Sequence, residues 1–174
     1  GAALVLDESW SGDSQVRVLS SQSRDVGAAE ARKRVQCALS MARADRLYKK
    51  IDSTLRGHLA MEIAAAAEHS GRARAVISPA VPEQGRIVRD GILSVHGVPL
   101  AESRFAQDAR WPATSSNVPE LIGLPCMHLG LDVVRSGDAE LARAMGELAL
   151  EFARPVSVLV DRRGRVVTVA AGDA

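Results

Sequence analysis

Short apolar runs alternate with longer amphipathic segments along most of this chain, which restricts the folds open to it. The runs typical of strands are residues 3–6, 15–20, 46–51, 73–78, 126–131, 156–160 and 166–169. The segments with helical periodicity are 26–43, 59–70 and 138–152. In the first of these, Ala31, Val35, Leu39 and Ala42 recur at spacings of three or four and form one apolar face. Such alternation favours an α/β fold with a mainly parallel sheet flanked by helices.

Two segments depart from the alternation. Residues 91–100 (GILSVHGVPL) have two apolar arms around His96-Gly97, which predicts a β-hairpin. Residues 101–117 are polar and rich in turn formers, and they predict an excursion over the surface, followed by a helical turn at 118–122. The chain has 174 residues and no repeat or evident linker, so we expect a single α/β domain spanning 1–174.

The charge balance excludes some partners. The chain carries 22 basic and 21 acidic residues, a net charge of +1, and only 3% aromatic residues. These values argue against nucleic acid and an anionic membrane as partners. No apolar run approaches the ~20 residues of a membrane span. Cys37 and Cys126 lie in apolar runs outside any metal-ligand spacing, so we expect buried reduced thiols and a cytoplasmic protein.

The segment 49–57, KKIDSTLRG, predicts a strand, a turn and then a helix. Ser53 or Thr54 could cap that helix, and the free amides at a helix start attract anions. Asp52 repels an anion and suits an acceptor for substrate hydroxyls, or a base. The candidate binding residues of this segment are Lys50, Asp52, Ser53, Thr54, Arg56 and Gly57. A small anionic polyhydroxy acid would satisfy the whole set. A surface ion pair with a helix cap, serving structure only, is the competing interpretation.

Other charged residues follow neighbouring predicted strands. Arg24 follows the strand 15–20, and Arg86 follows the strand 73–78 and its proline-rich loop. If these strands are parallel, their carboxyl ends share an edge, and four cations converge there with Asp52. His58 could face the ligand, and Asp108 and Glu102 could belong to the site or to the surface. No glycine-rich phosphate loop and no metal-binding motif occurs in the sequence.

Three motifs together resemble the N-terminal domain of the four-carbon acid sugar kinase family. They are YKKIDSTLRG, SPAVPEQGR and GILSVHGVPLAESRFAQD, and the resemblance extends over residues 16–118. It implies an ATP-dependent kinase that uses Mg²⁺ and phosphorylates threonate, erythronate or their 2-keto relatives. It also implies that an N-terminal α/β domain holds the sugar acid and a separate C-terminal domain holds the nucleotide.

The resemblance assigns roles to individual residues. It implies that Asp52 is the catalytic residue. The substrate-binding residues that it implies are Arg24, Lys50, Asp52, Ser53, Thr54, Arg56, Gly57, Gly85 and Arg86. The family's opening Asp-Asp-x-Thr-Gly-Ala segment has no counterpart here, Ser20-Ser21 stands where the family has Asp-Thr, and His58 stands where it has Asn.

The expected function is therefore the substrate-binding portion of a four-carbon acid sugar kinase. Because no nucleotide motif occurs, we expect the chain to be incomplete. ATP and Mg²⁺ would bind a partner domain or chain. A homodimer is one possible assembly of this chain. One alternative is a non-catalytic sugar-acid-binding or regulatory module. Another is a degenerate domain whose motif serves structure only.

Overall fold

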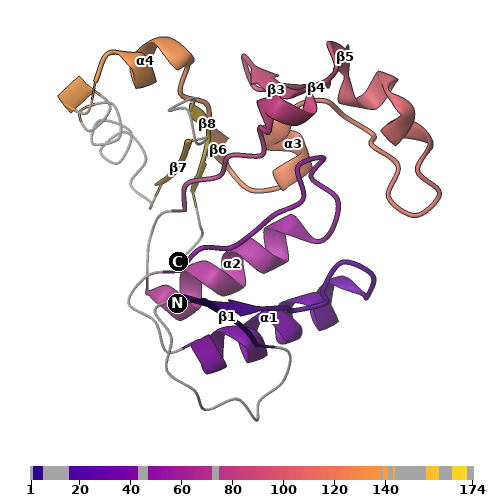
Figure 1. Cartoon of the computed structure of the whole chain (residues 1–174), viewed down its shortest axis with the longest axis vertical. Coiled ribbons are helices and arrows are strands. Elements are labelled where there is room, and N and C mark those ends of the chain that lie inside the picture. The colour runs from indigo at the N-terminus through magenta and orange to yellow at the C-terminus, as the bar shows by residue number, and fades with distance from the viewer. Residues whose placement is uncertain are drawn as a thin grey trace.

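A computed structural model describes residues 2–5, 16–42, 47–71, 75–137, 139–140, 143, 156–160 and 166–171 (Figure 1). The α-helices are Ala28–Ala42 (α1), Leu59–Ser70 (α2), Val118–Ile122 (α3) and Leu131–Arg135 (α4). The 3₁₀ helices are Pro82–Gln84, Leu100–Glu102 and Arg104–Gln107. The strands are Ala2–Val5 (β1), Val16–Leu19 (β2), Arg86–Arg89 (β3), Ile92–Val95 (β4), Val98–Pro99 (β5), Cys126–Met127 (β6), Val156–Val160 (β7) and Val166–Ala171 (β8).

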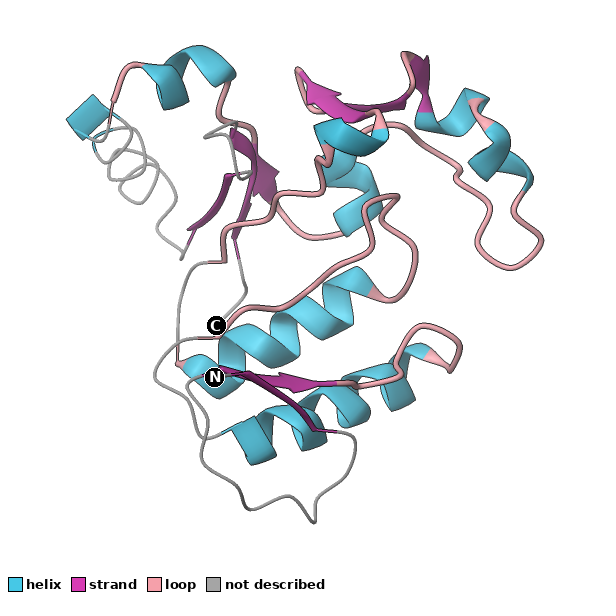
Figure 2. Ribbon diagram, in the orientation of Figure 1, coloured by secondary structure: helices cyan, strands magenta, loops and turns pink. Residues whose placement is uncertain are grey.

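The described strands form three small sheets, with helices beside them (Figure 2). Only β1 and β2 pair in parallel, in register from Ala2 opposite Val16 to Val5 opposite Leu19. The orders β3-β4-β5 and β6-β8-β7 are both antiparallel. The α/β class is therefore confirmed, but the prediction of a mainly parallel sheet is wrong for the described residues.

Two expected strands explain that difference. Within 46–51 and 73–78, the described residues form no strand pairing beyond an isolated bridge at Val76. A central parallel strand is buried on both faces and needs a continuous apolar run. Here Lys49 and Lys50 interrupt the first run, and Tyr48 is 87% exposed. The second run continues directly into Pro79, which has no amide hydrogen to donate to a sheet.

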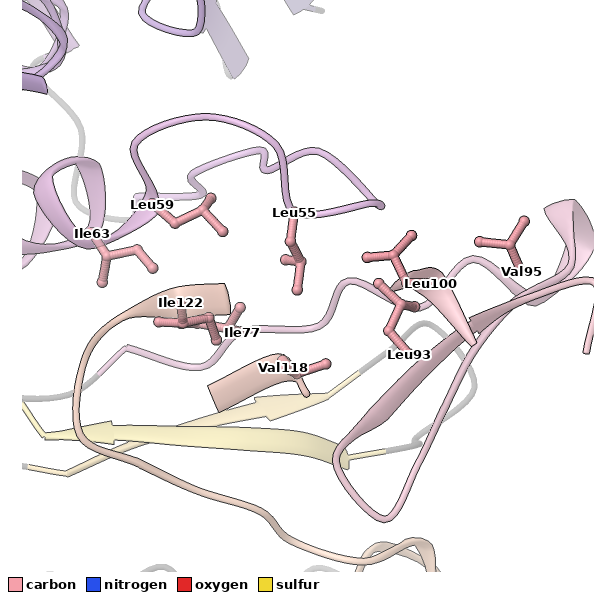
Figure 3. Close-up of a cluster of buried hydrophobic side chains, with 9 residues drawn as sticks. All are labelled: Leu55, Leu59, Ile63, Ile77, Leu93, Val95, Leu100, Val118 and Ile122. Atoms are coloured by element: carbon pink, nitrogen blue, oxygen red, sulfur yellow. The ribbon is translucent and has the colours of Figure 1, made fainter. Parts of the chain in front are cut away.

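The main hydrophobic core joins residues 49–57, called the motif loop below, with α2, the segment 75–80, the hairpin and α3 (Figure 3). Its buried side chains are Leu55, Leu59, Ile63, Ile77, Leu93, Val95, Leu100, Val118 and Ile122. Leu55 has a positive φ of 59°, which is unfavourable for a residue with a side chain. Its side chain is 5% exposed, so core packing holds the motif loop in this conformation.

A second cluster lies between α1 and α2, where Val35 and Leu39 pack against Ala65 and Ala66. The predicted apolar face of α1 is confirmed at Ala31, Val35 and Leu39, all of them buried. Burial of these small and branched side chains along one stripe places α1 against α2.

The structure settles several expectations about element ends. α2 begins at Leu59 as predicted, and Gly71 ends it in the left-handed conformation. His58 occupies the N-cap position, and its side chain makes no capping hydrogen bond to the first turn, so the prediction that Ser53 or Thr54 caps this helix is wrong. Both residues lie too far before the first turn to reach its free amides.

The hairpin is confirmed by β4 and β5, and β3 adds a third strand to it. The pairing of 156–160 with 166–169 is also confirmed. The strand expected at 126–131 is limited to β6, because α4 begins at Leu131. Most of the helix expected at 138–152 lies outside the described residues.

The prediction of two buried cysteines is wrong for Cys37, which is exposed on α1. Cys126 is partly buried, and burial raises the pKa of its thiol to about 12. In the part of the chain that the structure describes, no helix combines the length and apolar character needed to cross a membrane.

Candidate functional site

Asp52 is the centre of a hydrogen-bonded cluster in the motif loop. Its Oδ2 atom accepts hydrogen bonds from Thr54 Oγ1 (2.7 Å) and Arg56 Nε (2.7 Å), and its Oδ1 accepts from Arg56 Nη2 (3.3 Å). Arg24 Nη2 lies 3.7 Å from Oδ1. The loop and the segment before α1 therefore meet at one carboxylate, as the sequence predicted for Arg24, Asp52, Thr54 and Arg56.

The environment of Asp52 keeps its carboxyl ionised. Burial by itself raises the pKa of Asp52, but the hydrogen bonds from Arg56 and Thr54 and the charges of Arg56 and Arg24 outweigh burial. Together they hold the pKa of this carboxyl well below its usual range. A carboxylate of such low basicity is better suited to accepting hydrogen bonds than to removing protons.

Arg56 lies between two carboxylates. On one side it makes the paired contact with Asp52, and on the other its Nη1 donates to Asp108 Oδ2 (3.2 Å). Asp108 is fixed in turn, because its Oδ1 accepts from the backbone amides of Arg110 (3.0 Å) and Trp111 (2.8 Å). These backbone hydrogen bonds, together with Arg56, lower the pKa of Asp108. Asp108 therefore belongs to the site, whereas the sequence left it between site and surface.

Three arginines lie around the aromatic ring of Phe105, and one of them is Arg56 of the Asp52 cluster. The guanidinium carbons of Arg56, Arg86 and Arg104 lie 5.8, 6.0 and 5.2 Å from the centre of its ring. Arg86 comes from the start of β3, and its Nη1 donates to the Gln84 side-chain oxygen. The Nε atom of Arg86 is buried, and no described residue accepts a hydrogen bond from it.

Gly85 is required by the hairpin. It has a φ of +67°, and a Cβ at this position would lie 2.2 Å from Nδ1 of the His96 ring. The His96 amide also donates to the Gly85 carbonyl oxygen (2.7 Å). The turn residue His96 thus covers Gly85 and fixes the backbone from which Arg86 emerges. Gly57 also has a positive φ of 109°, but a Cβ there would meet only ordinary contacts at 3.8 Å.

A buried acid supports the site from α2. Glu62 accepts a hydrogen bond from Ser23 Oγ (2.8 Å) and an ion-paired hydrogen bond from Lys49 Nζ, and its side chain is 7% exposed. It therefore ties the segment that carries Arg24 to the segment that carries Asp52. Sequence reasoning missed Glu62, which lies among alanines in α2 and has no motif signal of its own.

The remaining candidates in the motif are less involved. The structure leaves Lys50 exposed, and Lys49, rather than Lys50, pairs with the buried acid. Ser53 is half-buried, and among the described residues it makes no hydrogen bond with the Asp52 cluster. Glu102 is exposed on the 3₁₀ helix after β5.

His58 packs within the protein. Its Nε2 donates to the Val26 carbonyl oxygen (2.5 Å), and its ring meets Trp111 edge-on at 5.0 Å. Trp111 Nε1 donates to Asp25 Oδ1 (3.4 Å), and Arg110 pairs with the same oxygen at 3.3 Å. Residues 108–113 therefore lie across the motif loop and reach the segment before α1.

A recess of about 150 Å³ remains between the motif loop and residues 111–113. Its lining residues are Thr54, Leu55, Arg56, Gly57, Trp111, Pro112, Ala113 and Leu121. It offers a hydroxylated ligand polar contacts on one side and apolar walls on the other. Among the described residues, no group of three or more His, Cys, Asp or Glu side chains could hold a metal ion.

Phe105, Asp108 and Trp111 are the neighbours that complete the site around the predicted residues. Phe105 and Asp108 lie in the FAQD sequence that closes the third motif, which is the signal that could have identified them. Arg104 precedes them, but its sequence gave no indication of its place beside Arg86.

Comparisons with known proteins identify the family of this chain. A family model described as a sugar-binding N-terminal domain matches residues 2–167. D-threonate kinase of Salmonella typhimurium strain LT2 is 40% identical over 130 residues, which cover 70% of this chain and 31% of that protein. D-threonate kinase of Bordetella bronchiseptica is 37% identical over 161 residues, which cover 90% of this chain and 36% of that protein.

A solved structure is similar as well. It is a domain of unknown function from Bordetella bronchiseptica, crystallised with bound citrate as a domain-swapped dimer, and it is 39% identical with a TM-score of 0.69. The match covers 83% of this chain and 36% of that chain. The chain thus spans about a third of the length of these relatives, between 31% and 36%.

Proposed function

Because this chain belongs to the family of sugar-binding N-terminal domains, we propose that it holds the sugar acid for an ATP-dependent kinase. The substrate of that kinase is a four-carbon acid sugar, namely threonate, erythronate or a 2-keto relative. The observation that carries the proposal is the meeting of Arg24 and Arg56 at the carboxylate of Asp52. Of these three residues, Arg56 also lines the small recess.

Asp52 contributes acceptor oxygens for substrate hydroxyls. Its low pKa keeps it ionised, and its contacts with Thr54 and Arg56 fix the directions of its lone pairs. Hydrogen bonds between a hydroxyl and a charged group are worth about 1.5–3 kcal/mol, which is enough to select a hydroxylated ligand. The catalytic role that the resemblance implies for Asp52 would then be the orientation of a hydroxyl.

Cations contribute the attraction for the ligand carboxylate. Arg24 has a side chain that is 45% exposed and makes only a long contact of 3.7 Å with Asp52, so it can turn towards a ligand. Lys50 is exposed beside the same loop, and Ser53, Gly57 and Gly85 complete the proposed binding set. A neutral sugar would gain little from such an array.

Phosphoryl transfer also requires a nucleotide and a metal ion to neutralise the developing charge. Among the described residues, no group of three or more His, Cys, Asp or Glu side chains could hold a metal ion, and the sequence has no glycine-rich phosphate loop. We therefore assign ATP and Mg²⁺ to a partner domain or chain, in line with relatives that are about three times as long, of which this chain covers 31% to 36%. A homodimer is the proposed assembly, by likeness to the domain-swapped relative.

Calorimetry on the 174-residue chain tests the proposal. D- and L-threonate, D- and L-erythronate and their 2-keto forms would be titrated in turn, without ATP. We expect saturable binding of at least one of them, and at least tenfold weaker binding by Arg24→Ala and Asp52→Asn. Arg89→Ala is the matched control, because it removes an exposed arginine of β3 outside the Asp52 cluster.

Circular dichroism would establish that each variant is folded. If the folded wild-type chain binds none of these acids, the proposal fails. If an acid binds and the full-length protein never phosphorylates it with ATP, the non-catalytic binding module is the better description.

A further inference from the structure

The three arginines around Phe105 differ in whether a carboxylate of the protein balances their charge. Arg56 is paired with Asp52 and Asp108, so its charge is balanced within the protein. Among the described residues, neither Arg86 nor Arg104 forms an ion pair with a carboxylate. Arg86 contacts the neutral side-chain oxygen of Gln84, and its buried Nε hydrogen has no acceptor.

Such an arrangement is unfavourable without a further partner. A buried donor that lacks an acceptor has lost its hydrogen bond to water without replacement. The attraction of a cation for an aromatic ring offsets this loss only in part, and cations gathered around one ring repel one another. An oxyanion next to Arg86 and Arg104 would supply the missing acceptor and balance both charges.

Solvent can reach Arg104. A broad open hollow of about 400 Å³ lies against the hairpin and the 3₁₀ helices, and its lining residues are Val95, His96, Val98, Glu102, Ser103 and Arg104. Arg104 is exposed there, so its guanidinium can turn towards an arriving ligand. Glu102 is the acidic member of the lining and would repel an anion within the hollow.

We propose that Arg86 and Arg104, held beside Phe105, form an oxyanion subsite of this domain. It takes the carboxylate of the acid sugar or the phosphoryl group of its phosphorylated product, while Asp52 accepts hydrogen bonds from the hydroxyls. This inference rests on the proposed function for the identity of the ligand. Arg104 becomes a specificity residue, which selects a charged acid over a neutral polyol of the same length.

The test is calorimetry on wild type, Arg104→Ala and Arg104→Lys, with Arg89→Ala as the matched control. The ligands are the acid sugar that binds wild type best, the neutral polyol threitol and inorganic phosphate. We expect Arg104→Ala to weaken acid binding about tenfold or more, since a hydrogen bond to a charged group is worth about 1.5–3 kcal/mol. Arg104→Lys should restore part of the loss, and Arg89→Ala should cause none.

Threitol, which is neutral, and inorganic phosphate identify the chemical group that the subsite recognises. Threitol is expected to bind wild type weakly, because it lacks a carboxylate. For the same reason, its affinity for Arg104→Ala should equal its affinity for wild type. Phosphate binding that depends on Arg104 would assign the subsite to the phosphoryl group. Acid binding that depends on Arg104, without phosphate binding, would assign it to the carboxylate.

The inference is overturned if Arg104→Ala changes the binding of both the acid and phosphate by less than twofold, or if it weakens the binding of acid and threitol equally. It is also overturned if wild type binds neither acid nor phosphate. If phosphate binds through Arg104 but no acid sugar binds, the proposed function fails and the oxyanion subsite stands.

Discussion

The motif loop and the Phe105 region both present arginines, but they treat charge in opposite ways. In the loop, Arg56 is enclosed by Asp52 and Asp108, and the carboxylate of Asp52 is 11% exposed. At Phe105, Arg86 and Arg104 have no carboxylate partner in the described part of the chain, and one buried donor is unmatched. The loop therefore balances its charges within the protein, whereas no described carboxylate balances the charges of Arg86 and Arg104.

This difference changes the meaning of the KKIDSTLRG motif. A cation that the protein already neutralises contributes rigidity, and a cation without a partner contributes affinity. The protein already balances the charge of Arg56, so the structural interpretation of the motif applies to this residue. The binding interpretation stays a proposal, in which Arg24, Arg86 and Arg104 contact the ligand.

Asp52→Asn is expected to have the largest effect on stability. It leaves Arg56 with Asp108 alone and removes the charge that Arg24 and Thr54 contact. Breaking a buried pair costs about 3–5 kcal/mol, and partial exposure of Arg56 reduces this to about 2–3 kcal/mol of unfolding free energy. Urea denaturation measures it. A loss below about 0.5 kcal/mol would show that the loop does not depend on its internal pairing.

Gly85→Ala should be next, with a loss of about 1–2 kcal/mol. A Cβ would collide with the His96 ring, and φ at this position is +67°. The double variant Gly85→Ala/His96→Ala should recover the part caused by collision and keep the part caused by the backbone. Thermal denaturation of the three variants separates them. If His96→Ala recovers nothing, the ring does not restrict residue 85.

Lowering the pH should reduce the unfolding free energy as Asp52 loses its charge, by less than either of the two substitutions above. The pKa of Asp52 is lowered in the folded chain, whereas an unfolded Asp titrates near ~3.9. The stability from this pairing is therefore fully present above about pH 4 and is lost as pH falls further, towards the folded pKa. Between pH 5 and 2.5, unfolding free energies from urea titrations should fall more steeply for wild type than for Asp52→Asn. Equal slopes would contradict the pairing.

Arg104→Ala should have the smallest effect on stability, below about 0.5 kcal/mol, because the residue is exposed and no ion pair of the described chain includes it. Together, Arg104→Ala and Asp52→Asn test the comparison between the two regions most directly. We expect Asp52 to be important for folding and Arg104 for binding. A loss above 1 kcal/mol in thermal or urea denaturation would place Arg104 on the structural side.

The sequence predicted elements best where local periodicity decides them. The apolar stripe of α1, the span of α2 with Gly71 at its end, and the hairpin around His96-Gly97 follow from spacing and turn chemistry. It failed for the strands expected around Lys49 and Pro79, because pairing depends on tertiary partners that no local pattern shows.

The site was predictable only in part, for a similar reason. Arg24, Asp52, Thr54 and Arg56 lie together as their motifs suggested. The contributions of Glu62, Phe105 and Trp111 depend on contacts over long separations, such as Ser23 with Glu62 or Trp111 with Asp25. Those contacts exist only once the chain has folded.

The position of α2 has a consequence for how this domain opens. Leu59 and Ile63 belong to the main core, and Ala65 and Ala66 belong to the cluster shared with α1. Neither cluster can separate without baring one side of this helix, so the two should melt as a single cooperative unit. The backbone amides of α2 should then exchange with deuterated solvent more slowly than those of any other described helix. If a ligand enters, we expect the loops to move and α2 to keep its position between the two clusters.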